Sequence, residues 1–221
     1  MRKPIEEVWT YEKLETPFQT ELAMTMSKSF GDIKALEPIF RFSWNASSEL
    51  GVWGADRAWV HMLADDAVPK LEGILNKEMI TDVQPLDAAH RDLQRIKDAC
   101  SIVKAHTFKH PLEPGQLSPK VKLLLSILAR HFGESVKKKC IVFTKQRNTA
   151  RILLQLTRQL EIPNLRPGIL VGARRSDITG SATLRSQFLA LVQFRKGDIN
   201  CLVSTHVHCC KSVLEWKSDN H

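Results

Sequence analysis

The sequence predicts an α/β protein in which a helical bundle is followed by a parallel sheet with flanking helices. In residues 1–110, apolar residues recur at spacings of three and four, which is typical of helices that pack on one face. After the segment 111–118, short apolar runs alternate with helical segments, and this alternation favours parallel strands joined by right-handed crossovers. We therefore expect a helical region, a linker at 111–118 and a sheet-bearing region that starts at residue 119.

The helical region carries a long apolar stripe. Its members are Leu50, Trp53, Val60, Ala64, Ala67, Leu71 and Ile74. Pro69 interrupts the stripe, so we expect the helix to kink there or a second helix to begin. A further helix is predicted from Leu86 to about Lys109. Its inward-facing residues are Leu93, Ile96, Ala99, Cys100 and Val103.

The segment KHPLEPGQLSP marks the boundary between the two regions, because it holds three prolines and a glycine. Ser118 and Pro119 suit the N-cap and the first turn of a helix over SPKVKLLLSILARHF. The runs KCIVFTK, GILVG and INCLVST are predicted to be strands. Between them, RNTARILLQLTRQL and ATLRSQFLALVQFRKG are predicted helices, the second ended by Gly197. The first of these two helices has one apolar face, formed by Ala150, Leu153, Leu154, Thr157 and Leu160.

Charge is distributed unevenly along the chain. The net charge is +8, but residues 1–110 carry 14 Lys and Arg against 17 Asp and Glu, whereas residues 111–221 carry 18 against 7. A basic region favours polyanions such as nucleic acid, because each cation that neutralises a phosphate releases counterions. From charge alone, a basic surface without any ligand is an equally good interpretation.

The sequence indicates an intracellular protein. No apolar run approaches the roughly 18 to 20 residues of a membrane span, and the start MRKPIEEVWTYEK is too acidic for a signal or transit peptide. An odd number of scattered cysteines does not match a secreted disulfide framework. These are Cys100, Cys140, Cys201, Cys209 and Cys210. We expect reduced thiols, a cytoplasmic or nuclear location, no secretion and no membrane partner.

Three loops follow the carboxyl ends of the predicted strands, where open parallel sheets bind their ligands. The loops are TKQRN, GARRSDITG and STHVHCC. The first two supply cations and hydroxyls suited to phosphate, namely Thr144, Lys145, Arg147, Thr149, Arg174 and Arg175. In the alternative interpretation these side chains are solvated or paired with carboxylates.

Other chemistry finds little support in the sequence. It contains no GxxxxGK[ST] loop and no GxGxxG after a strand, so it cannot bind a triphosphate through either of these motifs. No catalytic residue is predicted, because Asp65 with Asp66 fits a solvated helix end, and Asp177 and Asp198 fit turns.

A zinc site in the stretch STHVHCC is also not favoured. The possible ligands are His206, His208, Cys209 and Cys210. Structural zinc sites space their ligands more widely, and four ligands within five residues cannot easily close a tetrahedron around one ion. We therefore expect no metal in this chain.

Four segments resemble the second RecA-like domain of superfamily 2 helicases of the Dicer and RNA-sensing group. They are SPKVKLLLSIL, CIVFTKQRNTARIL, LVGARRSD and LALVQFRKGDINCLVST. The stretch SSELGVWGADRAW resembles the start of the helical insertion in Dicer helicase regions. The chain thus resembles Dicer-like proteins of the fungal type, most strongly from about residue 47 to residue 207. This resemblance implies a helical insertion region at 1–110, an incomplete RecA-like domain of the P-loop NTPase type at 119–207, and a disordered tail outside the family pattern at 208–221.

The resemblance also implies where RNA binds. In the family, the fourth motif, here IVFTKQR, and the fifth, which follows FRKGDINCLVST, contact the RNA backbone. Together with the loop arginines, the candidate nucleic-acid-binding residues are Thr144, Lys145, Gln146, Arg147, Gly172, Arg174, Arg175, Ser204 and Thr205. In the insertion signature, Trp53 and Trp59 are expected to anchor the core, and Asp56 with Arg57 to form an ion pair or a cap.

The family pattern breaks off in the fifth motif. After Val207 the family expects EEGxD, but the sequence reads HCCKSVLEWKSDNH, which predicts a truncated product. In the shortened sheet, residues 199–204 would form an edge strand whose backbone N–H and C=O groups are unpaired on one side. In the family, ATP and Mg²⁺ bind between two RecA-like domains, and the first supplies the phosphate-binding loop and the DExD/H box, which this sequence lacks.

The resemblance implies a function for the whole relatives, which process double-stranded RNA for RNA silencing, including antiviral defence. We expect this chain alone to bind double-stranded RNA weakly, to hold no cofactor, and to lack ATPase and nuclease sites. Its further partners would be the N-terminal RecA-like domain and the nuclease modules of the same protein. Two alternatives stay open: a non-catalytic regulatory isoform that binds RNA or protein, and a fragment of a related RNA-sensing or fork-remodelling helicase.

Overall fold

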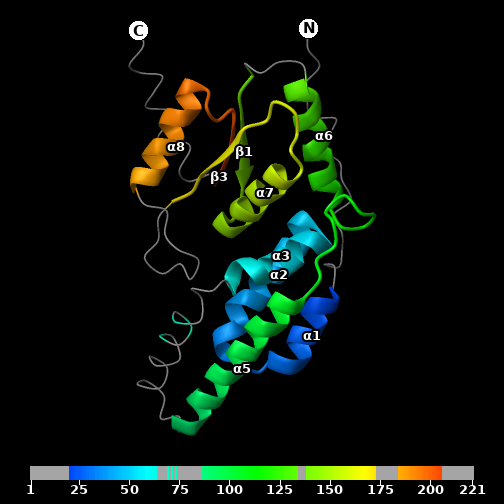
Figure 1. Cartoon of the computed structure of the whole chain (residues 1–221), viewed down its shortest axis with the longest axis vertical. Helices are drawn as coiled ribbons and strands as arrows, with labels where there is room; N and C mark the ends of the chain where they lie inside the picture. The colour runs from blue at the N-terminus through cyan, green and yellow to red at the C-terminus, as the bar shows by residue number, and fades with distance from the viewer. Residues whose placement is uncertain are drawn as a thin grey trace.

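The computed structural model of the chain describes residues 20–63, 69, 71, 73, 86–133, 138–172 and 184–205. Helices form the first part, and a three-stranded parallel sheet with flanking helices forms the second (Figure 1). The predicted fold class is confirmed, because this is the architecture of an incomplete RecA-like domain preceded by helices. Within the described part of the chain, no helix combines the length and the hydropathy that a membrane crossing requires.

The first helices lie below the sheet in Figure 1. In chain order they are α1 (Glu21–Phe30), the 3-10 helix η2 (Lys34–Leu36), α2 (Glu37–Leu50) and α3 (Val52–Met62). The chain turns between α2 and α3 at Gly51, whose φ of +96° suits only glycine. The predicted stripe is therefore divided, with Leu50 on α2, Trp53 and Val60 on α3, and Leu71 beyond α3, and these residues share one core. Ala64, Ala67 and Ile74 lie outside the described residues.

The long helix α5 (Leu86–Ala105) closes this core. Its predicted inner face is confirmed, since Ile96, Ala99, Cys100 and Val103 are buried and Leu93 is half-buried against them. The helix ends at Ala105, before the predicted end at Lys109. The residues that follow leave the helix to run toward the α2–α3 turn.

Trp53 and Trp59 anchor this core, as the sequence predicts. They are 2% and 0% exposed. The ring of Phe40 meets the ring of Trp59 edge-on, with centroids 4.9 Å apart. The signature GVWGAD is therefore first a packing element, which buries the two α3 tryptophans in the core that includes residues of α2 and α5.

Asp56 makes a different contact from the one predicted for it. Its Oδ2 lies 3.7 Å from Nε2 of His106, at the end of α5, whereas Arg57 lies over the rings of Trp53 and Phe108. Burial raises the pKa of Asp56, and a hydrogen bond from Thr20 together with the nearby His106 opposes that shift only in part. Arg57 also acts on Asp56 through its charge. The direct contacts of the two side chains are with His106 and with the Trp53 and Phe108 rings, so an ion pair or a cap formed by Asp56 with Arg57 stays a prediction.

The connector is attached to the α2–α3 turn by backbone hydrogen bonds. The N–H of Trp53 donates to the carbonyl of Gln116, and the N–H of Ser118 donates to the carbonyl of Leu50, both at 3.0 Å. This close approach requires a glycine at residue 51, since a Cβ there would lie 2.5 Å from the Ser118 nitrogen. The proline-rich segment thus fixes the helical region to the sheet-bearing region, although a domain boundary at 111–118 stays a prediction.

The sheet-bearing region follows the predicted order of elements. They are α6 (Pro119–Gly133), β1 (Cys140–Thr144), α7 (Arg147–Gln159), β2 (Pro167–Leu170), α8 (Leu184–Lys196) and β3 (Cys201–Thr205). Ser118 caps α6 as predicted, because its Oγ accepts a hydrogen bond from the N–H of Val121 at 3.3 Å. Gly197 ends α8 with a φ of +88°. The predicted inner face of α7 is also buried, with only Leu160 half-exposed.

The three strands are parallel and lie in the order β1-β3-β2. The last strand in sequence is therefore the central one, and all its residues are buried. The expectation that residues 199–204 form an unpaired edge strand is wrong, because β3 inserts between the two earlier strands and pairs on both sides. The edges of the described sheet are β1 and β2.

Candidate nucleic-acid interface

The carboxyl ends of the three strands meet at one edge of the sheet, which points toward α2 and α3 (Figure 1). Thr144 is the register partner of Thr205, and Leu170 is the partner of Ser204. Gly172 lies two residues after the end of β2. The fold thus brings together most of the predicted candidates at the junction of the two regions. Those outside the described residues are Arg174, Arg175 and the whole stretch 206–221, with His206, His208, Cys209 and Cys210.

The loop between β1 and α7 presents an exposed cation beside a helix start. The hydroxyl of Thr144 donates to the carbonyl of Gln146 at 3.0 Å, which fixes the loop. Gln146 is the N-cap of α7, and its side chain does not cap the helix amides. The first turn of α7 holds no acidic residue, and Lys145 next to it is exposed. A positive helix end and an exposed ammonium together favour a phosphate.

Arg147 connects two of the loops. It is half-buried, and its Nη1 donates to the carbonyl of Gly172 at 3.2 Å. This contact joins the start of α7 to the chain that leaves β2. We infer that Arg147 holds the loops in position, while Lys145 is the cation more accessible to a polyanion.

Ser204 and Thr205 lie inside the sheet edge, at 0% and 7% exposure. The hydroxyl of Ser204 donates to the carbonyl of Leu170 at 2.8 Å, and so ties β3 to β2. These side chains shape the edge from within, and a direct contact with RNA stays a prediction for them.

Replacing Ser204 with alanine is expected to lower the free energy of unfolding by about 1 kcal/mol, because one buried hydrogen bond is lost. A purely internal role of the hydroxyl, which faces Leu170, leaves the RNA affinity unchanged, whereas the predicted direct contact with RNA would lower it. Urea denaturation and a fluorescence titration with RNA measure the two quantities on the same sample. A loss of affinity at unchanged stability would contradict this role.

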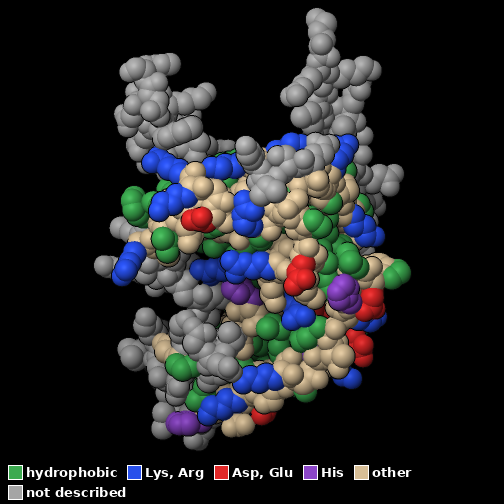
Figure 2. Space-filling view, turned by 45° about the horizontal axis from the view of Figure 1, so that its top comes forward, with side chains coloured by type: hydrophobic (Ala, Val, Ile, Leu, Met, Phe, Trp, Pro, Cys, Tyr) green, Lys and Arg blue, Asp and Glu red, His purple; other side chains and the backbone are tan. Residues whose placement is uncertain are grey.

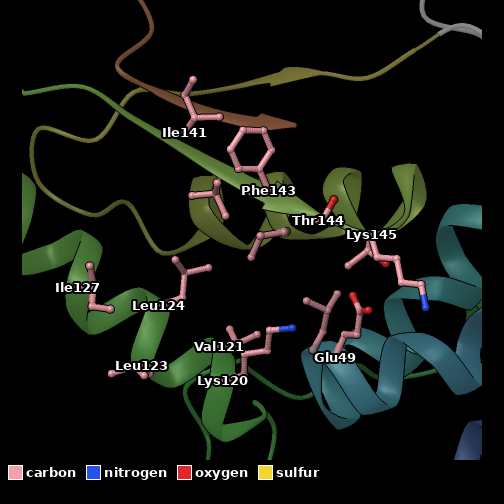
Figure 3. Close-up of a pocket in the computed structure, with 14 residues that line it drawn as sticks. Glu49, Lys120, Val121, Leu123, Leu124, Ile127, Ile141, Phe143, Thr144 and Lys145 are labelled. Atoms are coloured by element: carbon pink, nitrogen blue, oxygen red, sulfur yellow. The ribbon is translucent and has the colours of Figure 1, made fainter. Parts of the chain in front are cut away.

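Thr149 is placed differently from the sequence-based expectation. It is 2% exposed, and its hydroxyl has no hydrogen-bond partner among the described residues. It lines an apolar cavity of about 330 Å³ between α6 and β1, shown in Figure 3. The helical period of α7 turns Thr149 toward the core, so it does not belong to the phosphate-facing surface.

Two residues at the polar end of this cavity were not predicted from the sequence. Lys120 comes from α6 and Glu49 from the end of α2, and Figure 3 shows Glu49 between Lys120 and Lys145. No pattern in the sequence connects these positions, because the docked connector brings them together. The Glu49 carboxylate reduces the positive potential beside Lys145 and would weaken binding of a phosphate there.

The surface around the sheet is strongly basic. Figure 2 shows Lys and Arg side chains spread over the upper, sheet-bearing part of the visible face. Across the described residues from 119 to 205, the acidic ones are Glu161 and Asp198. The exposed cations there are Lys120, Lys122, Arg130, Lys139, Lys145, Arg158, Arg185, Arg195 and Lys196. Such a surface attracts polyanions over a long range at low ionic strength.

These features define the class of protein: an incomplete RecA-like domain of the P-loop NTPase type, joined to a helical region by a docked connector. No protein-family model matches the chain. The chain is 54% identical over 208 residues to Dicer-like protein 1 of Aspergillus clavatus and 50% identical over 209 residues to that of Aspergillus niger. It is 36% identical over 203 residues to Dicer-like protein 1 of Chaetomium globosum.

The alignments cover 93% of this chain for the two Aspergillus proteins and 89% for the Chaetomium protein. They cover only 14%, 14% and 13% of the relatives' own lengths. The chain belongs to the fungal Dicer-like proteins and corresponds to a fragment of one. The predicted resemblance is thereby confirmed, and it is favoured over a fragment of an RNA-sensing or fork-remodelling helicase.

Proposed function

We propose that this chain is part of the helicase region of a Dicer-like endoribonuclease that processes double-stranded RNA for RNA silencing, antiviral defence included. The observation that carries the proposal is the position of exposed Lys145 beside the positive start of α7, at the carboxyl edge of a basic RecA-like sheet. The names of the relatives support the enzyme class. In the whole protein the site would act in the cytoplasm or the nucleus.

The edge is suited to RNA backbone and not to bases. Lys145 and the first amides of α7 are phosphate donors, and such contacts carry no sequence information. Double-stranded RNA is recognised mostly through its shape, phosphates and 2′-hydroxyls. Arg147 keeps the loops after β1 and β2 at a fixed separation through its bond to Gly172, so the donors are preorganised. We therefore expect sequence-independent, salt-sensitive binding.

ATP hydrolysis would require further parts of the protein. Among the described strand-end residues, Lys145 is the exposed cation, and one ammonium does not suffice to hold a triphosphate with Mg²⁺. The sequence also contains no GxxxxGK[ST] loop. In the whole protein, the N-terminal RecA-like domain would supply the nucleotide cradle and the nuclease modules would cleave RNA. The isolated chain is expected to show no ATPase activity above buffer, and steady phosphate release by the purified chain would contradict this.

Replacing Lys145 with glutamine is expected to weaken binding of a double-stranded RNA about three- to fivefold, because one phosphate contact is lost. The measurement is a fluorescence anisotropy titration of the full chain at low salt, with two RNA duplexes of unrelated sequence. The loss should be the same for both duplexes.

The matched control is Lys196 replaced with glutamine. This lysine is also exposed, but it ends α8 at the opposite, amino edge of the sheet. The same charge is removed, so a general effect of net charge would weaken both variants equally. Equal losses in the two variants would refute the placement of the site, and an unchanged affinity of the Lys145 variant would do the same.

A further inference from the structure

Two cysteines face each other at the amino edge of the sheet. Cys140 and Cys201 are the first residues of β1 and β3, and they are register partners in the parallel ladder. Neighbouring strands lie about 4.8 Å apart, which is within the roughly 4.4 to 6.8 Å between Cα atoms that a disulfide spans. Their thiols form a hydrogen bond, and both are free thiols in the structure. The two sulfur atoms are thus already adjacent.

The surroundings of the two thiols differ. Cys201 is completely buried and packs with Leu128 and Phe132 of α6. Cys140 packs on the edge of the same cluster but is only half-buried, so a small reagent can approach it. The preceding residue, Lys139, is exposed, and its Nζ donates to the carbonyl of Arg195 at 2.9 Å. One thiol is therefore accessible from solvent, and the other is buried behind it.

We propose that Cys140 and Cys201 are a peroxide-sensitive pair that forms a reversible disulfide between β1 and β3. In the first step, the Cys140 thiolate attacks one oxygen of the peroxide, the O–O bond breaks, and the leaving hydroxide takes up a proton to become water. Cys140 is then a sulfenic acid. In the second step, the Cys201 sulfur attacks the Cys140 sulfur, the S–O bond breaks, and a second water leaves with the thiol proton. Two thiols lose two electrons, and hydrogen peroxide becomes two waters.

The order of these steps follows from the electrostatics of the pair. The hydrogen bond from Cys201 lowers the pKa of Cys140 because it stabilises the Cys140 thiolate. The same hydrogen bond, together with burial, raises the pKa of Cys201. At a given pH more of Cys140 is therefore ionised, and the thiolate is the form that reacts with peroxide. Cys140 attacks first, and Cys201 resolves the sulfenic acid.

The bond would join the start of β1 to the start of β3, and so would close the loop that contains α7, β2 and α8. Closing a long loop stabilises the folded state, mainly by restricting the unfolded chain. Disulfides in reducing compartments are commonly transient and redox-sensing. The pair lies at the edge opposite Lys145, so the inference does not depend on the proposed RNA site.

The test is mass spectrometry of the full chain after treatment with hydrogen peroxide, alkylation of remaining thiols and proteolysis. We expect a Cys140–Cys201 linked peptide that disappears when dithiothreitol is added, and a melting temperature that rises on oxidation and falls again on reduction. Finding Cys140 and Cys201 both alkylated as free thiols after oxidation would overturn the inference. Links from either residue to Cys100, Cys209, Cys210 or a second chain as the main product would also overturn it.

Two variants separate the roles of the thiols. With Cys201 replaced by serine, the Cys140 sulfenic acid should accumulate and react with dimedone, whereas dimedone labelling of wild type should be weak. The matched control is Cys100→Ser, which removes a buried cysteine from the helical region and should leave the linked peptide unchanged. Failure of Cys140 to take up dimedone in a folded C201S protein would contradict the proposed order. If a variant does not fold, the search for the linked peptide in the wild-type chain still tests the disulfide.

Discussion

Replacing Gly51 with alanine is expected to lower the free energy of unfolding by more than about 4 kcal/mol. The new Cβ would lie 2.5 Å from the nitrogen of Ser118, 2.6 Å from the oxygen of Gln116 and 2.8 Å from the carbonyl carbon of Leu117. All three are backbone atoms, so no side-chain rotation can relieve the clash. The φ of +96° adds strain for any residue with a Cβ. The connector must move away from the α2–α3 turn, and its hydrogen bonds to Trp53 and Leu50 are lost.

Gly115 provides the matched control, because it has a φ of +79° and no atom within 4 Å of an added Cβ. Its replacement with alanine should cost only about 1 to 2 kcal/mol, the strain of the left-handed backbone. Urea denaturation of the full-length chain, followed by circular dichroism, compares the two. If both variants lose the same stability, the close approach of the connector to Gly51 does not fix the two regions together.

Replacing Trp59 with alanine is expected to cost about 3 to 5 kcal/mol, because it leaves a large cavity in the helical core. Trp59 is 0% exposed and packs edge-on against Phe40. Its Nε1 has no hydrogen-bond partner among the described residues, so the loss is one of packing and not of a polar contact. Thermal and urea unfolding of the same samples measure the effect.

Trp44 on α2 is the matched control for this change, since it is 51% exposed. Its replacement with alanine should cost less than about 1 kcal/mol. Similar losses for the two tryptophans would contradict the assignment of Trp59 as the core anchor.

The local elements of this fold could be predicted from the sequence because their signals are local. Ser118 and Gly197 carry the capping chemistry of a helix start and a helix end, and the structure uses both. The apolar runs at β1 and β3 similarly predict buried strands, and β3 is fully buried. The prediction is wrong for β1, which is an edge strand of the described sheet and only half-buried, with Phe143 exposed. The division between α2 and α3 was missed because both helices turn apolar faces to the same core. The helical spacing of apolar residues therefore continues across Gly51.

The arrangement of the candidate site could be predicted only in part. Parallel strands place their carboxyl ends together, which is why Thr144, Gly172 and Thr205 lie at one edge. The central position of β3 could not be predicted, since strand order depends on tertiary packing and not on chain order. Lys120 and Glu49 could not be found for the same reason, as they reach Lys145 only through the docking of the connector.

The salt dependence of RNA binding tests the placement of the phosphate site most directly. Each phosphate contact contributes about 0.9 to the slope of log Kobs against log salt concentration for a duplex. The full chain with Lys145 replaced by glutamine should therefore bind with a slope shallower by about 1 than wild type, whereas the Lys196 variant should keep the wild-type slope. An unchanged slope for the Lys145 variant, or an equal decrease in both variants, would contradict a phosphate site at the carboxyl edge of the sheet.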